Sequence, residues 1–390
     1  MKTFKIALKA LSVLAVLYIG TVLIVPPLLD KKHNKVRKSP PYTVSDQAMA
    51  LYNSLDFISD LHCDALLWNR DLTVKNEVGH VDFPRMQEAN MALQAFTIVT
   101  KSPAGQNFSK NTGDAFDNIS LLSFVQGRPP SHWFSLFERA KYQSQKLHEM
   151  ADAFEGDFIV VKSKADFKNL ISLRKSNRKA IGGFLGIEGA HCLEGQIENL
   201  DRLYDAGVRM LGPTHFFDNE LGGSAHGVSK GGLTDFGHKV IERMNELGMI
   251  IDLAHAAPAM IDDILAQSTG PVLSSHTGVR GTLNNPRNLS DTHIRRIAAH
   301  GGLIGIAYFK GAVTAPEIKG IVDAMEHVKA IAGIDCIALG SDFDGSATMP
   351  FDVTGLPLLV EELLNRGFAE DEIRAIMGGN VKRFMLKNLR

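Results

Sequence analysis

A histidine and an aspartate lie two residues apart in the stretch ISDLHCDALLW, which covers residues 58–68. On a β-strand, residues two apart point to the same side, so His62 and Asp64 would direct an imidazole and a carboxylate to one place. Both groups are common metal ligands, which makes the pair a candidate half of a metal site. The alternative is a strand-end turn with two solvated polar residues, because short motifs often occur by chance.

Other residues that can bind a metal or move a proton also follow short apolar runs. They are Glu188, His215, His255, His276, Asp342 and Asp344. A single histidine in such a place is more often a buried, hydrogen-bonded residue than a ligand, but the shared position of four is hard to explain that way.

Cysteine is an unsuitable ligand in this chain. Its three cysteines, Cys63, Cys192 and Cys336, form no CxxC pair, so a disulfide framework and a thiolate zinc site are both disfavoured. Cys63 lies between His62 and Asp64 and would face the opposite way, into packing. Histidines with carboxylates are the ligands of hydrolytic zinc sites.

The elements that must position these residues alternate between β-rich runs and helical patterns. The expected strands cover residues 56–61, 93–99, 181–187, 208–214, 249–253, 271–275, 302–308 and 336–341. Eight such units predict an α/β fold, a (β/α)8 TIM-type barrel with insertions. The carboxyl ends of the strands would meet at one end of the barrel, where the active sites of this fold lie.

Two segments fit this barrel less directly. Residues 158–163 are expected to form an accessory strand, and residues 101–157 are the least predictable part of the chain. The second and seventh expected strands contribute no evident ligand. Among the helices, TDFGHKVIERMNELG is a clear example, with Thr234 as N-cap, one apolar face, and Gly248 as the stop.

The N-terminus contains an apolar stretch, residues 10–29, that carries no charge over 20 residues and is long enough to span a membrane. No cleavage site of small residues follows it, so we expect a retained anchor over residues 1–29, with a cleaved signal peptide as the alternative. Residues 30–44 are expected to be a basic, proline-containing tether, and residues 45–390 the catalytic domain. We expect this domain on the extracytoplasmic, periplasmic side.

Charge is divided unevenly along the chain. The first 38 residues carry eight lysines and arginines and one aspartate, a net charge of +7, so the remainder carries −8 of the total of −1. An acidic folded part argues against nucleic acid as a partner.

An ordered set of motifs resembles a known family. SDLHCD, GIEGAH, LGPTH, IDLAHA, SSHTGVR, NNPRNLSD, GSDFDG and MGGNVKRF are similar, in this order from about residue 55 to 386, to the membrane (renal) dipeptidases. These are binuclear zinc hydrolases of the amidohydrolase-like barrel class. The resemblance implies hydrolysis of the peptide bond of dipeptides by a water activated between two zinc ions.

The resemblance also implies a role for each matching residue. His62 and Asp64 would hold one zinc, His255 and His276 the other, and Glu188 would bridge the two. His215 would contact the substrate and the developing oxyanion, and Asp342 would contact the substrate and move the proton. Arg287 would bind the free carboxylate of the substrate, a task suited to a planar guanidinium. As an alternative, Arg287 could pair with Asp291 on the following helix, and Asp344 is expected to shape its loop.

The chain also departs from the mammalian members of that family. It lacks their disulfide cysteines and a hydrophobic C-terminal tail, so the N-terminal helix would be the anchor. The glycine-rich stretch FFDNELGGSAHG after His215, with the extra His226, leaves the substrate pocket undefined. Another binuclear amidohydrolase acting on a cyclic amide, ester or lactone is an alternative, as is a tethered binding protein without catalysis. The oligomeric state is open, with a homodimer as one option.

Overall fold

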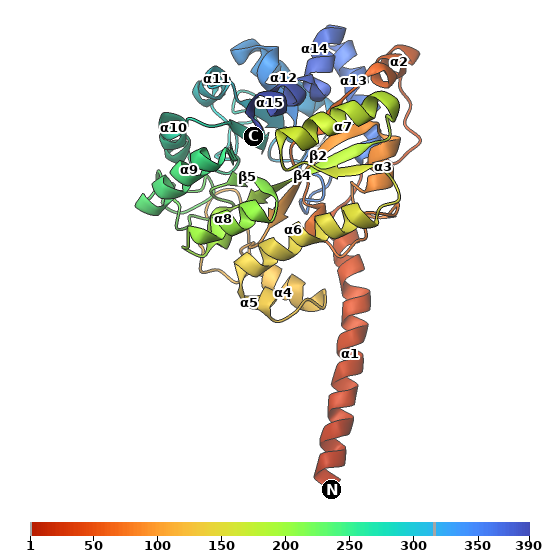
Figure 1. Cartoon of the computed structure of the whole chain (residues 1–390), viewed down its shortest axis with the longest axis vertical. Coiled ribbons are helices and arrows are strands. Elements are labelled where there is room, and N and C mark those ends of the chain that lie inside the picture. Colours follow the sequence, from red (N-terminus) through yellow and green to blue (C-terminus); the bar gives the residue numbers. More distant parts are fainter. Residues whose placement is uncertain (1, 315–316) are drawn as a thin grey trace.

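The computed structural model of the chain describes residues 2–314 and 317–390, and its centre is a closed barrel of parallel strands. The strand order is β2-β1-β9-β8-β7-β6-β5-β4-β3, and an additional pairing of β2 with β4 closes eight of the strands into a ring. The predicted (β/α)8 architecture is therefore confirmed (Figure 1). The strands are β1 Ile58–Asp60, β2 Met91–Val99, β3 Phe158–Val160, β4 Ile181–Glu188, β5 Val208–Gly212, β6 Ile250–Asp252, β7 Val272–Thr277, β8 Leu303–Ile306 and β9 Ile337–Leu339.

Strand β3, the one strand that is not part of the ring of eight, lies outside it, as expected for the accessory strand. It pairs only with the first three residues of β4, whereas β5 pairs with β4 from Leu185 onward. The glycines of β4 permit this crowding, because a Cβ added at Gly183 would lie 2.8 Å from the Phe158 ring and 2.9 Å from Phe96. The pairing of β2 with β4 aligns Val99 with Glu188, which sets Glu188 at the carboxyl end of the barrel.

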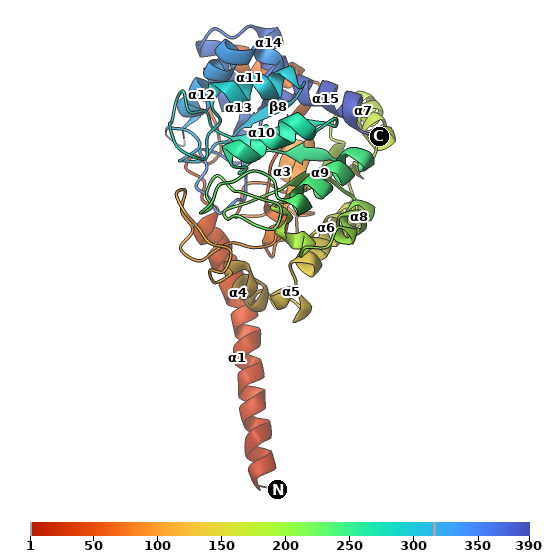
Figure 2. The same cartoon turned by 90° about the vertical axis from the view of Figure 1, so that its left-hand side faces the viewer.

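Helices follow the strands and cover the outside of the barrel (Figures 1 and 2). The helices of the domain are α2 Asp46–Ser54, α3 Phe83–Glu88, α4 Asn118–Val125, α5 Ser131–Phe134, α6 Leu136–Ala153, α7 Lys164–Ser176, α8 Glu198–Asp205, α9 Asp235–Leu247, α10 Pro258–Gln267, α11 Asp291–Ala299, α12 Ile318–Ala332, α13 Leu356–Asn365, α14 Glu370–Arg374 and α15 Asn380–Asn388.

Helix α9 shows why these segments become helices. The Thr234 side chain accepts a hydrogen bond from the backbone N–H of Gly237, and Gly248 ends the helix in the left-handed region with φ of 70°, both as the sequence predicts. Its buried face, with Val240, Ile241 and Met244, packs into the main hydrophobic core. Burying one such side chain contributes about 1.5–3 kcal/mol, so the apolar face fixes the helix against the barrel.

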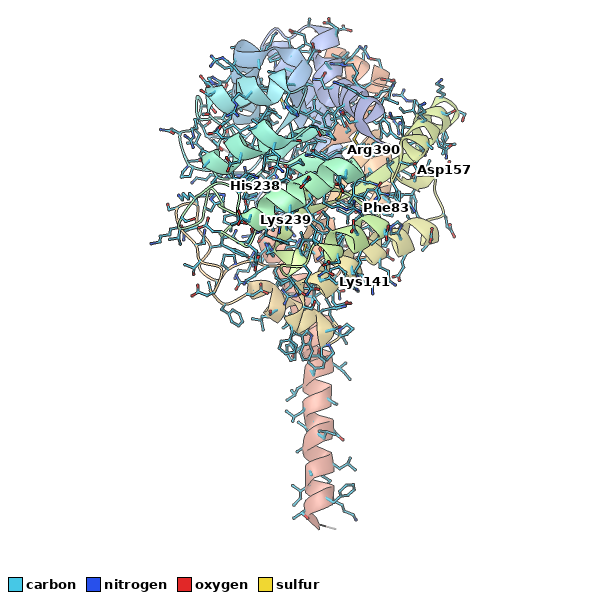
Figure 3. The ribbon with its side chains drawn as sticks, turned by 60° about the vertical axis from the view of Figure 1, so that its left-hand side comes forward. Phe83, Lys141, Asp157, His238, Lys239 and Arg390 are labelled. Carbon is cyan, nitrogen blue, oxygen red and sulfur yellow. The ribbon has the colours of Figure 1, made fainter. Side chains whose placement is uncertain are left out.

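The N-terminal helix α1 Lys2–His33 projects from one end of the domain (Figures 1 and 2). Among the described residues it is the one helix long and apolar enough to cross a membrane, with a mean hydropathy of 2.3 over its most apolar window. Most side chains of its N-terminal half extend away from the domain (Figure 3).

The end of α1 differs from the tether expected over residues 30–44. The helix continues to His33, and Asp30 and Asn34 are buried against the domain. The following residues pair with the segment after β9, where Arg37 N–H donates to the Met349 carbonyl at 3.0 Å. A composition that is basic and contains prolines indicated a solvated linker, but the buried Asp30 gives this segment a specific partner, described below.

Candidate metal centre

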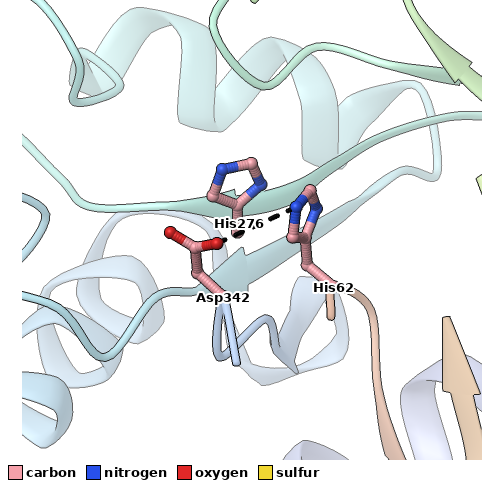
Figure 4. Close-up of side chains that lie close together, drawn as sticks. All are labelled: His62, His276 and Asp342. Carbon is pink, nitrogen blue, oxygen red and sulfur yellow. Dashed lines mark ion pairs between the residues drawn. The ribbon is translucent and has the colours of Figure 1, made fainter. Parts of the chain in front are cut away.

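The strand ends bring together, at one end of the barrel, the side chains that the sequence singles out. His62 and Asp64 follow β1, Glu188 ends β4, His215 follows β5, His255 follows β6, His276 lies in β7, and Asp342 follows β9. All seven are at least nine-tenths buried. Figure 4 shows His62, His276 and Asp342 pointing toward one another at the ends of three different strands.

Glu188 is the hub of the cluster. Its Oε1 lies 2.9 Å from His255 Nε2, 3.3 Å from His276 Nε2 and 3.6 Å from His62 Nε2. Its other oxygen, Oε2, lies 3.2 Å from His215 Nε2. One carboxylate thus faces four imidazoles through its two oxygens, so it is placed to act as a metal ligand on more than one side.

Three groups in the cluster have ligand atoms within 4.8 Å of one another: His62 with Asp64 and Glu188, Glu188 with His215 and His255, and His62 with His276 and Asp342. The first group contains the expected pair of His62 and Asp64. The other two differ from the expected pairing of His255 with His276, since His215 and Asp342 also lie within ligand distance. His255 and His276 are nevertheless close, with their Nε2 atoms 3.0 Å apart.

The buried carboxylates of the cluster favour added positive charge. Burial, together with the charge of Asp64, raises the pKa of Glu188 well above its usual range, and burial likewise raises that of Asp342. Burial alone would lower the pKa of His62, but Glu188 and Asp64 outweigh it and raise this pKa to about 10. Three buried carboxylates at one point are therefore stable only with added positive charge, either a proton or a metal ion.

The remaining histidines have the protonation state that a metal needs. Burial lowers the pKa of His215, His255 and His276 well below the usual value, so these rings are neutral. The buried His62 Nε2 also has no hydrogen-bond partner among the described residues. Neutral imidazoles and carboxylates with free ligand atoms fit a metal ion.

Ser275 orients two of these rings. Its hydroxyl donates to Asp252 Oδ2 at 2.5 Å and lies 2.9 Å from His62 Nδ1 and 3.0 Å from His276 Nδ1. Because its one proton goes to Asp252, the hydroxyl must accept from the Nδ1–H of both rings. This leaves Nε2 of each ring as the atom that can bind a metal, in His62 by displacing a proton, which is the usual role of such outer partners.

Thr97, on β2, holds the first carboxylate. Its hydroxyl donates to Asp64 Oδ1 at 2.6 Å. The sequence predicts no ligand on the second expected strand. It also does not predict the supporting roles of Thr97, Ser275 and Asp252. A hydroxyl that precedes the end of an apolar strand run is the only signal that the sequence carries for Thr97, and it is weak.

Two cluster residues have left-handed backbones. His255 and Asp342 both have φ of 64°, a region that residues other than glycine adopt uncommonly. Each lies a few residues beyond the end of its strand, where the chain turns over the barrel. Strain of this kind costs of order 1–3 kcal/mol and is common where a functional side chain must be aimed.

Arg287 lies beside the cluster. Its Nη2 donates to the His276 carbonyl at 2.6 Å, and its positive charge lowers the pKa of both Glu188 and Asp342 against the effect of burial. The alternative partner Asp291 binds His327 instead, with Nε2 to Oδ1 at 2.7 Å. Arg287 is buried and is not among the residues that line the large cavity described next.

A cavity of about 880 Å³ contains the cluster. Asp64, Glu188, His215, His255, His276 and Asp342 line it on one side. Residues of α1 and α4 line it on another, including Val25 and Leu29 from α1 and Leu121 and Leu122 from α4. The volume suits a small molecule, and the side formed by α1 and α4 is apolar.

Asp344 belongs to the loop that carries Asp342 rather than to the cluster. Its carboxylate accepts from the backbone N–H of His80 at 2.8 Å and of Val81 at 3.2 Å, and lies 2.8 Å from Arg70 Nη2. Arg70 lowers its pKa far below the usual value despite the burial. These are the contacts of a residue that holds a loop. The neighbouring Cys63 is buried in the core, as expected.

Comparison with known proteins also indicates a metallopeptidase. The sequence profile of the membrane dipeptidase family (Peptidase family M19) matches residues 45–388. Dipeptidase 3 of Mus musculus is 32% identical over 220 residues, a match that covers 53% of this chain and 45% of the mouse protein. The matched part thus spans less than half the length of that relative.

Two solved structures share the fold. A metallopeptidase from Rhodobacter sphaeroides, liganded with a phosphinate mimic of the dipeptide L-Ala-D-Ala, has a TM-score of 0.69 and 24% identity, over 85% of this chain and 99% of the other. A probable dipeptidase from Pseudomonas aeruginosa has a TM-score of 0.72 and 20% identity, over 87% of this chain and 96% of the other. With the profile match across nearly the whole barrel, the chain belongs to the membrane dipeptidase family of metallopeptidases.

Proposed function

We propose that this protein is a zinc-dependent dipeptidase with two zinc ions per chain. The observation that carries the proposal is Glu188, whose two carboxylate oxygens lie within 3.6 Å of the Nε2 atoms of four histidines at the wall of a substrate-sized cavity. A hydrolytic zinc ion is usually bound by three or four protein ligands. Six ligand-type residues around one bridging carboxylate are more than one ion needs.

The residues that would hold the ions are His62, Asp64, Glu188, His255 and His276, with His62 and Asp64 on one ion, His255 and His276 on the other, and Glu188 between them. When bound, the two ions would supply a water acidified to near neutral pH and a Lewis acid for the scissile carbonyl. Thr97 and Ser275 would keep the ligands in place in the absence and presence of substrate.

His215 is proposed to contact the substrate and stabilise the developing oxyanion. Burial keeps its ring neutral, and its Nδ1 has no partner among the described residues, so one ring nitrogen is available as a donor when the other faces Glu188. A donor that is already fixed in a dry site stabilises transition-state charge without reorganisation.

Asp342 is proposed to contact the substrate and move the proton. It lines the cavity, and its Oδ1 lies 3.9 Å from His62 Nε2. A carboxyl group whose pKa is raised can accept a proton from water and return it to the leaving amine near neutral pH. This is the behaviour that distinguishes it from Asp344.

Arg287 is proposed to bind the free carboxylate of the dipeptide. Among its guanidinium nitrogens, Nη2 alone has a hydrogen-bond partner in the described part of the chain, the His276 carbonyl, and the buried Nε has none. A buried guanidinium with unused donors beside the cluster is suited to a carboxylate ligand. The proposal requires the substrate carboxylate to reach Arg287 from the cavity.

The apolar helix α1 supports a location at the membrane. We propose that α1 anchors the protein in the lipid bilayer with the barrel on the extracytoplasmic side. The apolar side chains of residues 4–24 are largely exposed on this helix, which in water would be unfavourable. Detergent, but not salt, should release the protein from the membrane fraction.

The experiment that tests the activity combines metal analysis with a substrate pair. The detergent-purified full chain should contain close to two zinc equivalents, should lose activity to a chelator and regain it with zinc, and should cleave a dipeptide but not its C-terminal amide. Cleavage of a lactone or cyclic amide in preference to dipeptides would point to the wider amidohydrolase class. Bound zinc without hydrolysis of either would indicate a binding protein.

A further inference from the structure

We propose that α4 and α5, residues 118–134, form a second membrane-contacting element beside α1, so that the catalytic cavity lies at the lipid surface. The partner to which we assign this face is the bilayer itself. The inference goes beyond the proposed dipeptidase activity, and it rests on the proposed anchoring by α1.

Helix α4 packs against the middle of α1. The Tyr18 hydroxyl donates to the Phe124 carbonyl at 3.0 Å, and the two aromatic rings lie 5.0 Å apart. The turn after α4 is equally close, because a Cβ added at Gly127 would lie 3.0 Å from Val22. Figures 1 and 2 both show α4 next to α1, with α5 beyond α4, at the end of the domain from which α1 projects.

The length of α1 sets the depth of this contact. A helix rises 1.5 Å per residue, so about 20 residues cross a hydrocarbon layer of about 30 Å. A layer that begins at Lys9 would end near Leu29, and one that begins at Lys2 would end near Val22. Tyr18 lies inside the layer in both cases, and tilting α1 would only increase the number of residues inside. The part of α4 that contacts Tyr18 must therefore reach the membrane.

The surface of α4 and α5 has the composition that this position requires. Phe134 is 83% exposed and Leu121 is 54% exposed, and Phe116 and Phe124 are exposed beside them. The only acidic or basic side chain in residues 118–134 apart from His132 is Arg128, which is buried and donates to the Leu67 carbonyl at 2.8 Å. An exposed apolar face without exposed charge is typical of an interfacial membrane element.

Trp133 adds an interfacial signal. Its ring packs edge-on against Phe124, and its indole N–H donates to the Arg128 carbonyl at 2.8 Å. Tryptophan is enriched where protein meets the headgroup region of a bilayer. The apolar face also continues directly into the lipid-exposed side of α1, which favours lipid over a second copy of the chain as the covering partner.

The consequence for the active site is an entrance at the membrane. The cavity that contains Glu188 and Asp342 is lined by Val25 and Leu29 of α1 and by Leu121 of α4. Because Val25 and Leu29 lie at the end of the apolar stretch, this side of the cavity sits where α1 leaves the bilayer. Substrate would then reach the cluster of Glu188 and the surrounding ligand residues along the lipid surface.

Depth measurement with a fluorescent label tests the proposal on the full chain. The native cysteines Cys63, Cys192 and Cys336 are all buried, so a thiol-reactive environment-sensitive dye should label only an introduced cysteine. The test variants are Leu121→Cys and Phe134→Cys. Val13→Cys on α1 is the positive control, and Glu370→Cys on α14, at the end of the domain opposite α1 in Figures 1 and 2, is the negative control.

The labelled proteins are reconstituted in vesicles of phosphatidylcholine and phosphatidylglycerol with and without doxyl-labelled lipid. We expect the lipid quencher to act on positions 121 and 134 at least about fivefold more strongly than on position 370, in line with burial of roughly 5–10 Å in the interface. Quenching at 13 but not at 121 and 134 would overturn the inference and leave the anchor intact. No quenching at 13 would refute the anchor itself. Emission at 121 and 134 that is blue-shifted but insensitive to the quencher would mean that protein covers the face, which also overturns the inference.

Discussion

The Asp30 carboxylate, in the last turn of α1, lies 2.8 Å from Nε of Arg70, and Nη2 of the same guanidinium lies 2.8 Å from Asp344 Oδ1. Arg70 is buried between the two carboxylates. A second connection is formed by Asn34, whose side-chain oxygen accepts from the Ser346 backbone N–H at 3.0 Å. The end of the proposed membrane helix is thus tied to the loop that carries Asp342.

Asp30→Asn should weaken this connection and affect catalysis through it. The substitution removes one of the two negative charges that Arg70 faces, so we expect a loss of about 1.5–3 kcal/mol in the free energy of unfolding, the usual range for hydrogen bonds to charged groups. It should also lower kcat more than it raises KM, because the Asp342 loop becomes less ordered. Thermal unfolding and dipeptide kinetics in detergent measure both, with the exposed Lys31→Gln as control. Kinetics equal to those of the control variant would show that α1 anchors without positioning Asp342.

Glu188→Gln should lose the metal pair. A neutral amide bridges two cations poorly, and four histidines then surround a group that no longer attracts positive charge. We expect the zinc content to fall from about two equivalents to one or less, measured by elemental analysis. The exposed Glu198→Gln, on α8, removes the same charge at the surface and should keep the full content. Full zinc content and activity in Glu188→Gln would refute the bridging role.

Asp342→Asn should separate proton transfer from metal binding. If Asp342 moves the proton in the transition state, kcat should fall by roughly 10²–10⁴-fold, the usual contribution of general acid–base catalysis. Zinc content should stay near that of the unsubstituted protein, since the five proposed ligands remain. A loss of zinc in parallel with activity would instead make Asp342 a ligand, as its place in the group with His62 and His276 would allow.

Arg287→Met should raise KM strongly and change kcat less. The substrate carboxylate is charged in the ground state and the transition state alike, so losing its partner removes uniform binding. The variant should also lose the preference for a dipeptide over its C-terminal amide. Arg280→Met is a matched control, since Arg280 lies nearby and its Nε donates to the Asn288 carbonyl at 3.0 Å. An unchanged KM and preference would place the carboxylate site elsewhere.

His191 should make the fold sensitive to acid. Burial, with the charge of Lys101 as a smaller cause, lowers its pKa from 6.5 to about 3. The unfolded chain therefore binds more protons than the folded one between these values, so stability is present above pH 6.5 and is lost as the pH falls toward 3. From pH 7 to pH 5 this loss amounts to about 2 kcal/mol.

His191→Phe tests this pH dependence. Neither ring nitrogen of His191 has a partner among the described residues, and the ring packs against Phe217 at 5.0 Å, so phenylalanine fits the same surroundings. The free energy of unfolding of the variant should fall by about 2 kcal/mol less than that of the unsubstituted protein between pH 7 and pH 5. Parallel pH profiles of the two proteins would show that His191 is not the acid-sensitive group.

Much of the fold and of the ligand set could be read from the sequence, because both depend on local patterns. Apolar strand runs that alternate with amphipathic helices specify a parallel barrel, and parallel strands place all of their carboxyl ends at one edge. A residue at the end of such a run, such as Glu188 or His276, is therefore predicted to lie at the carboxyl end of the barrel with the other strand-end residues, without knowledge of any contact. The helix caps Thr234 and Gly248 are local in the same sense.

Tertiary structure alone decided the contacts between residues that are distant in the chain. The Ser275 hydroxyl lies within hydrogen-bond distance of His62, which is 213 residues away in the sequence, and Thr97 donates to Asp64 from a neighbouring strand. The register of strand pairing sets which of these side chains meet. The composition of residues 30–44 predicts a tether, but it does not predict that Asp30 is buried against Arg70, since this charge finds its partner only after the barrel has closed. The packing of α4 against Tyr18 has the same origin. Periodicity reports which face of an element is apolar, but the partner of that face is chosen by the packing of the whole chain.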